Sequence, residues 1–348
     1  MTRRPFSPSP RQQGGYILAL NIAMLALMLV GAIHLGQRAS LAVSMARSEQ
    51  QHVDSLRAIE DAKARILFKL ATIPRTSAGL GIGANAAVLD GRPYRLGDEA
   101  IVQLYDVRGR VSVNALRLDG LGRERLERLL ATYGLETTQA NRLVDTLLDY
   151  RDADNLRRLS GAEREDYDQT GASPPRNGDL ASPHELARIA GWKDYPQLWG
   201  EDPITNHVSI EPRQMFNANT ATWRTLVAMT GIPHDMATAL TSDKRAGKLS
   251  DISRLALPNL SGDPFSGGLT FVAFPGDTTI VTIWTRNQPI GDQMAVTHTP
   301  ASPDSPWRIQ YMQRPTALPP EMDWDTIPAF PEAGSTSAPS ADQLRLPF

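Results

Sequence analysis

The 348-residue sequence contains no cysteine and has no marked excess of charge of either sign. Without cysteine the chain forms neither disulfides nor thiolate metal sites, and it has no cysteine nucleophile. Its 36 basic and 38 acidic residues give a formal net charge of −2. That balance excludes the broad basic surface that is typical of nucleic-acid-binding proteins.

Common catalytic motifs are missing as well. The six histidines are scattered, and His184-Glu185 has no second histidine four residues after the first, as a zinc protease site requires. No serine lies in a Gly-x-Ser-x-Gly elbow, and Gly247-Lys248 lacks the upstream glycine of a phosphate-binding loop. We therefore predict that the protein is not an enzyme.

One segment is similar to a DNA-binding motif but lacks its chemistry. Thr230–Ala256 has the pattern of a helix-hairpin-helix, in which backbone N–H groups bind a phosphate. The hairpin position here is Gly231-Ile232-Pro233, and proline has no N–H to donate. We interpret this segment as a helical packing unit and predict no nucleic-acid partner.

A long apolar run stands near the N-terminus, directly after Gly14-Gly15. Tyr16–Leu35 contains no charged residue, and 20 residues of helix span the roughly 30 Å core of a bilayer. The segment before it carries Arg3, Arg4 and Arg11 without an acidic residue. Positive charge favours the cytoplasmic side, so the rest of the chain is expected on the other side of the membrane.

The helical pattern continues beyond the apolar run. Leu56, Ile59, Ile66 and Leu70 recur at helical spacing and form an apolar stripe. No proline interrupts the chain between Tyr16 and Ile73, and Pro74 ends the pattern. The sequence predicts one helix of about 80 Å over Tyr16–Leu70, with the stripe packing partly within the molecule and partly on partners. On these residues alone, a simple single-pass anchor remains the alternative.

The remaining sequence predicts strands, then helices, then strands again. A glycine-rich loop covers residues 76–93, and strands are predicted at Ala100–Tyr105 and Arg110–Val113, joined by a turn. Helices are predicted at Arg123–Tyr133 and Thr138–Tyr150, after the cap Ser182, and within Thr220–Arg245. Strands are predicted at Leu269–Phe274, Thr278–Thr285, Gln293–Thr299 and Trp307–Met312, before a Pro-rich tail predicted to be disordered from Pro315. The order indicates a helical domain inserted into an α/β body.

Acidic residues gather after the second of these helices. Asp149, Asp152, Asp154, Glu163, Glu165, Asp166 and Asp168 lie within twenty residues. Oxygen ligands on a loop suit Ca²⁺, although the spacing is not that of an EF-hand. Arg157, Arg158 and Arg164 offer the alternative, which is a solvated surface of salt bridges.

Several landmarks, in this order, resemble the minor pseudopilin K family of type II secretion systems (general secretion pathway protein K). They are Gly15 before the apolar helix, DVRGRVSVNAL (Asp106–Leu116), LVDTLLDYRDAD (Leu143–Asp154), GAE (Gly161–Glu163), SPHELARIAGW (Ser182–Trp192) and FNANTATWRTLVAMTGI (Phe216–Ile232). The resemblance covers residues from Gly15 to about Arg314 and is weakest between Leu156 and Asp179.

The resemblance implies a fold and a domain organisation. The expected fold class is α+β, with a pilin-like long N-terminal helix, an antiparallel sheet and an inserted all-helical domain. The expected parts are a leader (1–15), a transmembrane half-helix (16–35), a periplasmic half-helix (36–73), the first part of the pilin-like body (74–115), the inserted helical domain (116–260), the return to the sheet (261–314) and the tail (315–348).

The resemblance also implies function. A prepilin peptidase would cut between Gly15 and Tyr16 and methylate the new amino terminus. Most pilin-like subunits have a glutamate at the fifth mature position, where its carboxylate neutralises the amino terminus of a neighbour; Leu20 stands there, which suits a subunit at the filament tip. The family's calcium region makes Asp152, Asp154 and Glu163 the first candidate ligands, with Glu165 and Asp166 beside them.

The expected protein is therefore a tip pseudopilin of the bacterial inner membrane, with its C-terminal body in the periplasm. Its expected partners are the I-type and J-type minor pseudopilins, the prepilin peptidase, the inner-membrane secretion platform and secreted proteins. The expected interface is Leu56, Ile59, Ile66 and Leu70. Two alternatives stay open: a minor pilin of a type IV pilus, and a single-pass periplasmic binding module without processing.

Overall fold

The structure is a computed structural model that describes residues 14–77, 79–82, 86–115, 121–213, 215–246, 249, 251–252, 255, 270–286, 288–317 and 322–331. The chain divides into two compact units, Met1–Arg57 and Ala58–Phe348. The boundary falls inside helix α1 (Gly14–Thr72), so the two parts of this helix are described separately. Residues 1–13 of the predicted leader lie outside the described residues.

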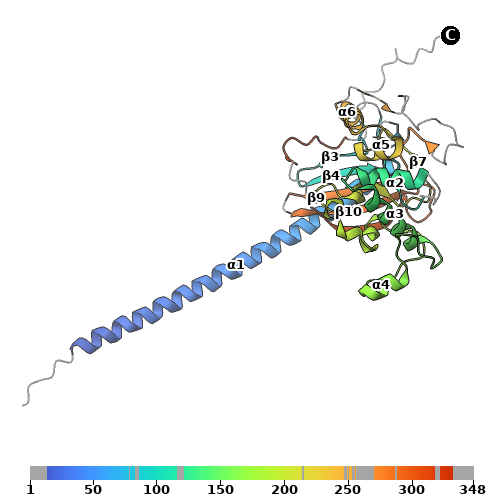
Figure 1. Ribbon diagram of the computed structural model, residues 1–348. Coiled ribbons are helices and arrows are strands. Elements are labelled where there is room, and N and C mark those ends of the chain that lie inside the picture. The colour runs from blue at the N-terminus through green and yellow to red at the C-terminus, as the bar shows by residue number, and fades with distance from the viewer. Residues whose placement is uncertain are drawn as a thin grey trace, which may run out of the picture. The chain divides into compact units, whose positions relative to one another are not determined.

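Helix α1 confirms the prediction of one uninterrupted helix (Figure 1). It ends at Thr72 because Pro74 disfavours helical backbone in the residue before it and cannot donate to the helix. In the first unit, every residue from 16 to 54 is exposed. In the second unit, Ile59, Ala62, Ile66 and Leu70 are each at most 2% exposed. The apolar stripe of this second part therefore belongs to the core of the body.

The body is built on an antiparallel sheet of five strands in the order β11-β10-β9-β4-β3. These strands are β3 (Asp90–Leu96), β4 (Ala100–Asp106), β9 (Thr278–Thr285), β10 (Gln288–His298) and β11 (Trp307–Ala317). One sheet face supplies Val102, Leu104, Val281, Ile283 and Met294 to a core that includes Ile66 and Leu70 of α1. The central strands β4 and β9 are distant in sequence, and the helices between them form the insertion (Figure 1).

A turn was predicted between β4 and a strand at Arg110–Val113, and this prediction is wrong. A 3₁₀ helix, η2 (Val107–Gly109), follows β4, and β5 (Val111–Ser112) pairs in parallel with β6 (Val208–Ser209). Glycine at 109 is needed for close approach, because a Cβ there would lie 2.5 Å from the carbonyl oxygen of Thr220.

The antiparallel neighbour of β4 is β3, which lies partly in the predicted glycine-rich loop. Its sequence DGRPYRL lacks the alternation of a typical strand, and its proline is tolerated because β3 is an edge strand. Gly91 has φ +82°, and a Cβ at this position would lie 2.1 Å from the ring of Tyr105. Glycine therefore allows β3 to pack closely against Tyr105.

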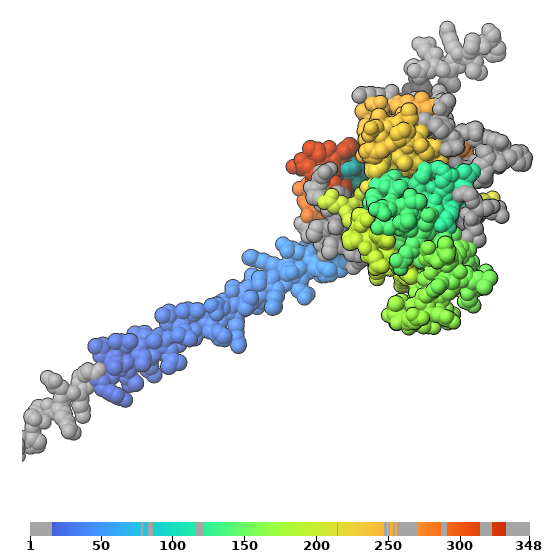
Figure 2. Space-filling model, viewed as in Figure 1, coloured from blue at the N-terminus to red at the C-terminus, as the bar shows by residue number. Residues whose placement is uncertain are grey.

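The chain between β4 and β9 contains a helical block with its own core. Its helices are α2 (Leu121–Ala131), α3 (Thr137–Arg151), α4 (Arg164–Thr170), α5 (Trp223–Thr230) and α6 (His234–Arg245), with 3₁₀ helices η3 (Pro183–Arg188), η4 (Trp192–Asp194), η5 (Pro196–Leu198) and η6 (Ile204–Asn206). The core includes Leu129, Leu147, Trp192, Leu226 and Met229. Figure 2 shows α4 at one end of this block and α5 and α6 at the other.

Short elements complete the described structure. Ser182 caps η3 by accepting from the N–H of His184 at 3.2 Å, as predicted. The short helix that follows is a 3₁₀ helix. Two further pairs are formed by β1 (Arg75–Thr76) with β2 (Gly79–Leu80) and by β7 (Met215–Phe216) with β8 (Thr270–Phe271). The strand predicted at Leu269–Phe274 is thus two residues long in the structure.

The C-terminal segment has more structure than the sequence predicts. Strand β11 continues through Pro315 to Ala317. Residues 322–331 then pack on the body, with Ile327 and Phe330 only 6% and 5% exposed. Arg95 of β3 donates its N–H to Pro328 and accepts from the N–H of Phe330, both at 2.8 Å. The prediction of disorder from Pro315 is wrong for these residues, because this segment covers the β3 edge; residues 332–348 lie outside the described residues.

The sheet and the helical block meet at a buried carboxylate, Asp106, at the end of β4. One oxygen accepts from the N–H groups of Arg108 at 3.0 Å and Gly276 at 2.8 Å. The other accepts from the amide of Asn217 at 3.1 Å and the hydroxyl of Thr220 at 2.9 Å. Burial raises the pKa of Asp106, and these four hydrogen bonds oppose that shift. Asp106 thereby joins β4, the loop before β9 and the segment that leads into α5.

We expect Asp106→Asn to destabilise the body. An asparagine amide would place two hydrogens where one carboxylate oxygen now accepts, and would leave at least one buried donor without an acceptor, at a cost of about 2 kcal/mol. The thermal unfolding midpoint of the full chain in detergent should fall. Asp98→Asn, at an exposed position in the turn between β3 and β4, is the matched control and should leave it unchanged. Equal midpoints for both variants would contradict the role of Asp106.

Candidate functional site

Three of the predicted calcium ligands come together at the end of α3. Asp152 is the C-cap of α3, Asp154 lies in the following loop, and Glu163 is the N-cap of α4. One carboxylate oxygen from each residue lies within 4.8 Å of the other two. The fold therefore gathers these acidic groups on one loop.

The buried state of Glu163 makes this cluster chemically unusual. Glu163 is 5% exposed, and among the described residues neither of its carboxylate oxygens has a hydrogen-bond partner; the same holds for Oδ1 of Asp152. Burial raises the pKa of Glu163, and the negative charges of Asp149, Asp152 and Asp154 raise it further. Oxygen ligands with unused capacity and mutual repulsion fit a hard cation such as Ca²⁺.

Arg158 supplies the alternative source of positive charge. Its guanidinium contacts both Asp149, whose side chain is fully buried, and Oδ2 of Asp152. Gly161 permits this packing, because a Cβ there would lie 1.8 Å from Oδ2 of Asp149. Salt bridges to Arg158 thus account for Asp149 and for one carboxylate oxygen of Asp152. They leave Glu163 and Asp154 without a cation among the described residues.

The other two predicted ligands lie outside the group of three. Asp166 accepts from the N–H of Glu163 at 2.9 Å and lies 3.2 Å from Arg157, so it serves the N-terminus of α4. Glu165 is exposed on the first turn of α4. Calcium binding by any of the five remains a prediction.

The predicted processing site lies at the start of α1. Gly15 and Tyr16 are in its first turn, and the apolar segment beginning at Tyr16 has a mean hydropathy of 2.4 with no part of it buried inside the protein. Leu20 is 54% exposed. A helix this long and apolar, with no protein around it, is suited to lie in a bilayer.

The stripe predicted as a partner interface is divided between uses. Ile59, Ile66 and Leu70 are buried within the protein, whereas Leu56 is half-buried. The intramolecular part of the predicted packing is therefore present. Contact of the stripe with other subunits remains a prediction.

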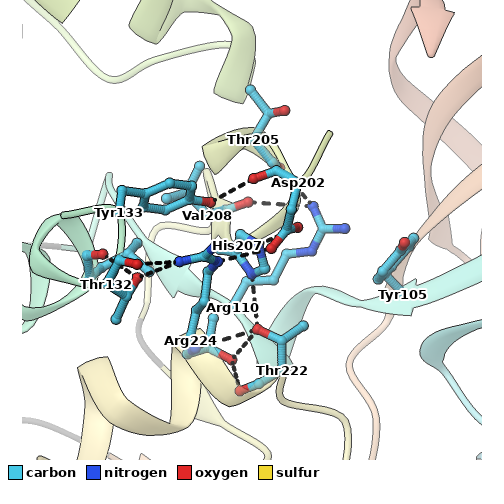
Figure 3. Close-up of polar contacts among 12 residues, drawn as sticks. Tyr105, Arg110, Thr132, Tyr133, Asp202, Thr205, His207, Val208, Thr222 and Arg224 are labelled. Carbon is cyan, nitrogen blue, oxygen red and sulfur yellow. Dashed lines mark hydrogen bonds and ion pairs between the residues drawn. The ribbon is translucent and has the colours of Figure 1, made fainter. Parts of the chain in front are cut away.

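A second polar cluster, centred on His207, was not predicted from the sequence (Figure 3). His207 Nε2 lies 2.7 Å from Oδ1 of Asp202, and Nδ1 lies 2.8 Å from the hydroxyl of Thr222. Arg224 donates to the other oxygen of Asp202 at 2.8 Å and stacks on Tyr133 at 4.1 Å. Burial opposes ionisation of Asp202, but His207 and Arg224 outweigh it and lower its pKa to about 2.

This arrangement of hydroxyl, imidazole and carboxylate is similar to the catalytic triad of a hydrolase, but its side chains have structural roles. The Thr222 hydroxyl caps α5 by accepting from the N–H of Thr225 at 3.3 Å. Burial is the main reason that the pKa of His207 is lowered. The cluster therefore fixes η6 against the end of α2 and the start of α5. The spacing of these residues could not have predicted the cluster, because Tyr133 and Arg224, which stack on each other, are distant in sequence.

Residues 109–196, which include the acidic cluster, match the family model of type II secretion system protein K. The similarity to protein K covers these residues of the chain. That similarity favours the prediction that the chain is not an enzyme.

The fold has a counterpart among solved structures. One chain of the GspK-GspI-GspJ complex from the enterotoxigenic Escherichia coli type 2 secretion system matches with a TM-score of 0.51 and 14% identity. The match covers 79% of this chain and 99% of that chain. It confirms the predicted α+β class, with its long helix, antiparallel sheet and inserted helices. No curated protein sequence matches the chain.

We expect the body to lose stability as the pH falls from about 6.5 to about 4. Burial, together with the charge of Arg110, lowers the pKa of His184 to about 4, so the folded protein binds fewer protons than the unfolded chain in this window. The shift arises where η3 packs on the sheet, since the His184 and Tyr311 rings lie 6.3 Å apart. Unfolding midpoints measured across this range should fall, and His184→Gln should make the decline shallower.

His234→Gln, at an exposed position on α6, controls for the loss of an imidazole. A decline that is equally steep in the wild type and in His184→Gln would contradict the contribution of His184.

Proposed function

We propose that this protein is a minor pseudopilin at the tip of the type II secretion pseudopilus, where it initiates or caps assembly and supports protein export across the outer membrane. The observation that carries the tip position is Leu20 at the fifth residue of the expected mature chain. A subunit within the filament needs an acidic group there, because an unpaired amino terminus is costly in an apolar bundle. A tip subunit has no earlier subunit whose amine must be neutralised.

The helical block supports the same position. It adds α2 to α6 and a separate core to a pilin-like sheet, which makes the body wide. A wide body is compatible with one end of a filament and hinders stacking along it. The natural partners are the I-type and J-type pseudopilins, since the solved structure with this fold comes from a GspK-GspI-GspJ complex.

The proposed location is the bacterial inner membrane, with a single pass and the body in the periplasm. The apolar residues from Tyr16 to Leu35 would span the bilayer, and Arg3, Arg4 and Arg11 would stay in the cytoplasm. A prepilin peptidase would cut after Gly15. The small side chain of Gly15 allows the backbone to enter a narrow active site.

We also propose that Asp152, Asp154 and Glu163 bind Ca²⁺. Their proximity and the unpartnered buried oxygens of Glu163 and Asp152 support this assignment. Bound calcium would be the cationic partner of the Glu163 carboxylate and would join the end of α3 to the start of α4. This closes a loop of the helical block without any part in catalysis.

We expect processing to depend on Gly15. In cells with the prepilin peptidase, the intact mass of the membrane-extracted protein should correspond to a chain that starts at methylated Tyr16. Gly15→Leu should block the cut because its side chain cannot enter the site, whereas Gly14→Ala, one residue earlier, should still be processed. A chain starting at Met1 or Thr2 in strains with and without the peptidase would refute the proposal. Cutting near Ala42 would instead indicate an ordinary exported protein.

Co-purification separates the two filament systems. The mature protein should form a stable complex with the I-type and J-type pseudopilins. A complex with type IV pilus subunits instead would show that the protein is a minor pilin of a type IV pilus.

We expect Ca²⁺ to raise the thermal unfolding midpoint of the full chain relative to EGTA. Ligand at 100 times its dissociation constant stabilises by about 2.7 kcal/mol. Asp154→Asn and Glu163→Gln should abolish most of the shift. Glu165→Gln, on the exposed side of α4, is the matched control and should retain it. An equal midpoint in Ca²⁺ and EGTA would refute the site and favour the salt bridges of Arg158.

A further inference from the structure

A cavity of about 560 Å³ lies where the sheet edge meets the helical block, away from the acidic cluster. Its wall on the sheet side is Asp90–Pro93 of β3 with Gln103 and Tyr105 of β4. Its opposite wall comes from Asn206, His207, Trp223 and Arg245. Because α4 and α6 lie at opposite ends of the block (Figure 2), this cavity is separate from the proposed calcium site.

The two carboxylates that line the cavity already have cationic partners. Asp90 accepts from Nε of Arg92 at 3.0 Å and from its Nη2 at 2.8 Å. Asp202 accepts from His207 and Arg224, as described above (Figure 3). These acidic groups are therefore satisfied, and the cavity has little remaining capacity to attract a cation.

Hydrogen-bond donors, in contrast, remain available. Gln103 uses its oxygen to accept from the Tyr105 hydroxyl at 3.1 Å, and its NH₂ group has no partner among the described residues. The Asn206 side chain makes no hydrogen bond with any other described residue. The exposed Arg245 makes neither a hydrogen bond nor an ion pair with them. A group that accepts hydrogen bonds and carries negative charge would use this capacity.

The net charge around the cavity is positive. Behind the wall, Arg110 stacks on Tyr105 at 4.8 Å and Arg224 stacks on Trp223 at 4.3 Å. The lining itself has two arginines, Arg92 and Arg245, and two aspartates, so the excess positive charge comes from the two arginines behind it. A partly enclosed site with excess positive charge concentrates anions.

The size of the site suits an organic ligand. A volume of about 560 Å³ is in the range of pockets that hold organic ligands rather than single ions. A smaller hollow of about 60 Å³ adjoins it and shares Asp90, Thr222, Trp223 and Arg245. The Tyr105 and Trp223 rings offer apolar contact, and the Gln103 and Asn206 amides suit backbone carbonyls.

We propose that this cavity binds an acidic peptide segment of a protein, with a ligand carboxylate on Arg245 and backbone carbonyls on Gln103 and Asn206. The proposal requires neither processing at Gly15 nor calcium, so its failure would leave the proposed function intact.

The test uses the full chain in detergent and a fluorescein-labelled hexapeptide of alternating alanine and glutamate, followed by fluorescence anisotropy. The same peptide with glutamine in place of glutamate is the neutral control. The acidic peptide should bind at least about tenfold more tightly, since hydrogen bonds to charged groups are stronger than neutral ones. Binding should weaken with added salt.

Two variants assign the site. Arg245→Glu should weaken binding of the acidic peptide by about tenfold or more, whereas Arg188→Glu, at an exposed position on η3, should change it less than twofold. Asn206→Leu should weaken both peptides. Unchanged thermal unfolding midpoints of the variants show that each is folded.

Three results would overturn the proposal. They are no binding up to millimolar peptide, equal binding of the acidic and neutral peptides, and an Arg245→Glu variant that binds like the wild type. Succinate separates the two sources of a carboxylate. Competition by succinate only at far higher concentration supports a peptide, whereas competition at the same molar concentration would replace the peptide with a small dicarboxylate.

Discussion

The arrangement of the body depends on one buried carboxylate, that of Asp106. The sheet and the helical block have separate apolar cores, so hydrophobic burial within each does not fix how they join. Asp106 accepts hydrogen bonds from Arg108, Gly276, Asn217 and Thr220, and these donors come from three separate segments. Because each hydrogen bond is directional, a relative rotation of the segments would leave buried donors unsatisfied. The carboxylate therefore sets an orientation that apolar contacts alone do not specify.

The features beyond this junction inherit its geometry. The same segment that supplies Asn217 and Thr220 leads directly into α5, whose N-cap hydroxyl contacts His207. His207 in turn holds Asp202, and both line the cavity against β3 and β4. A ligand site between two cores needs such a chain of polar contacts, since its walls belong to elements that do not share a hydrophobic core. This is the physical reason that polar side chains lie between the aromatic rings of the cavity wall.

Sequence patterns predicted the elements whose folding is local. Helix α1 and strand β9 have strong periodicity or β-branched composition, and the structure places them close to the predicted bounds. The acidic trio was also predictable, because a short loop brings Asp152, Asp154 and Glu163 together. Strand β3 was missed because Gly91 and Pro93 suit their positions through contacts with Tyr105 and the sheet edge, not through local propensity. The cavity combines residues from Asp90 to Arg245, which only the tertiary fold brings together.

The packing of α1 on the sheet requires a further constraint besides its apolar stripe. Ile59, Ala62, Ile66 and Leu70 repeat nearly every helical turn, so a shift of one turn, about 5.4 Å, would still bury apolar groups. Lys63 removes this ambiguity, since its ammonium lies 2.7 Å from Asp292 and both side chains are almost completely buried. A one-turn shift would separate two buried charges, which costs about 3–5 kcal/mol when a buried pair is broken. The ion pair thus contributes specificity of register, where the apolar stripe contributes most of the burial.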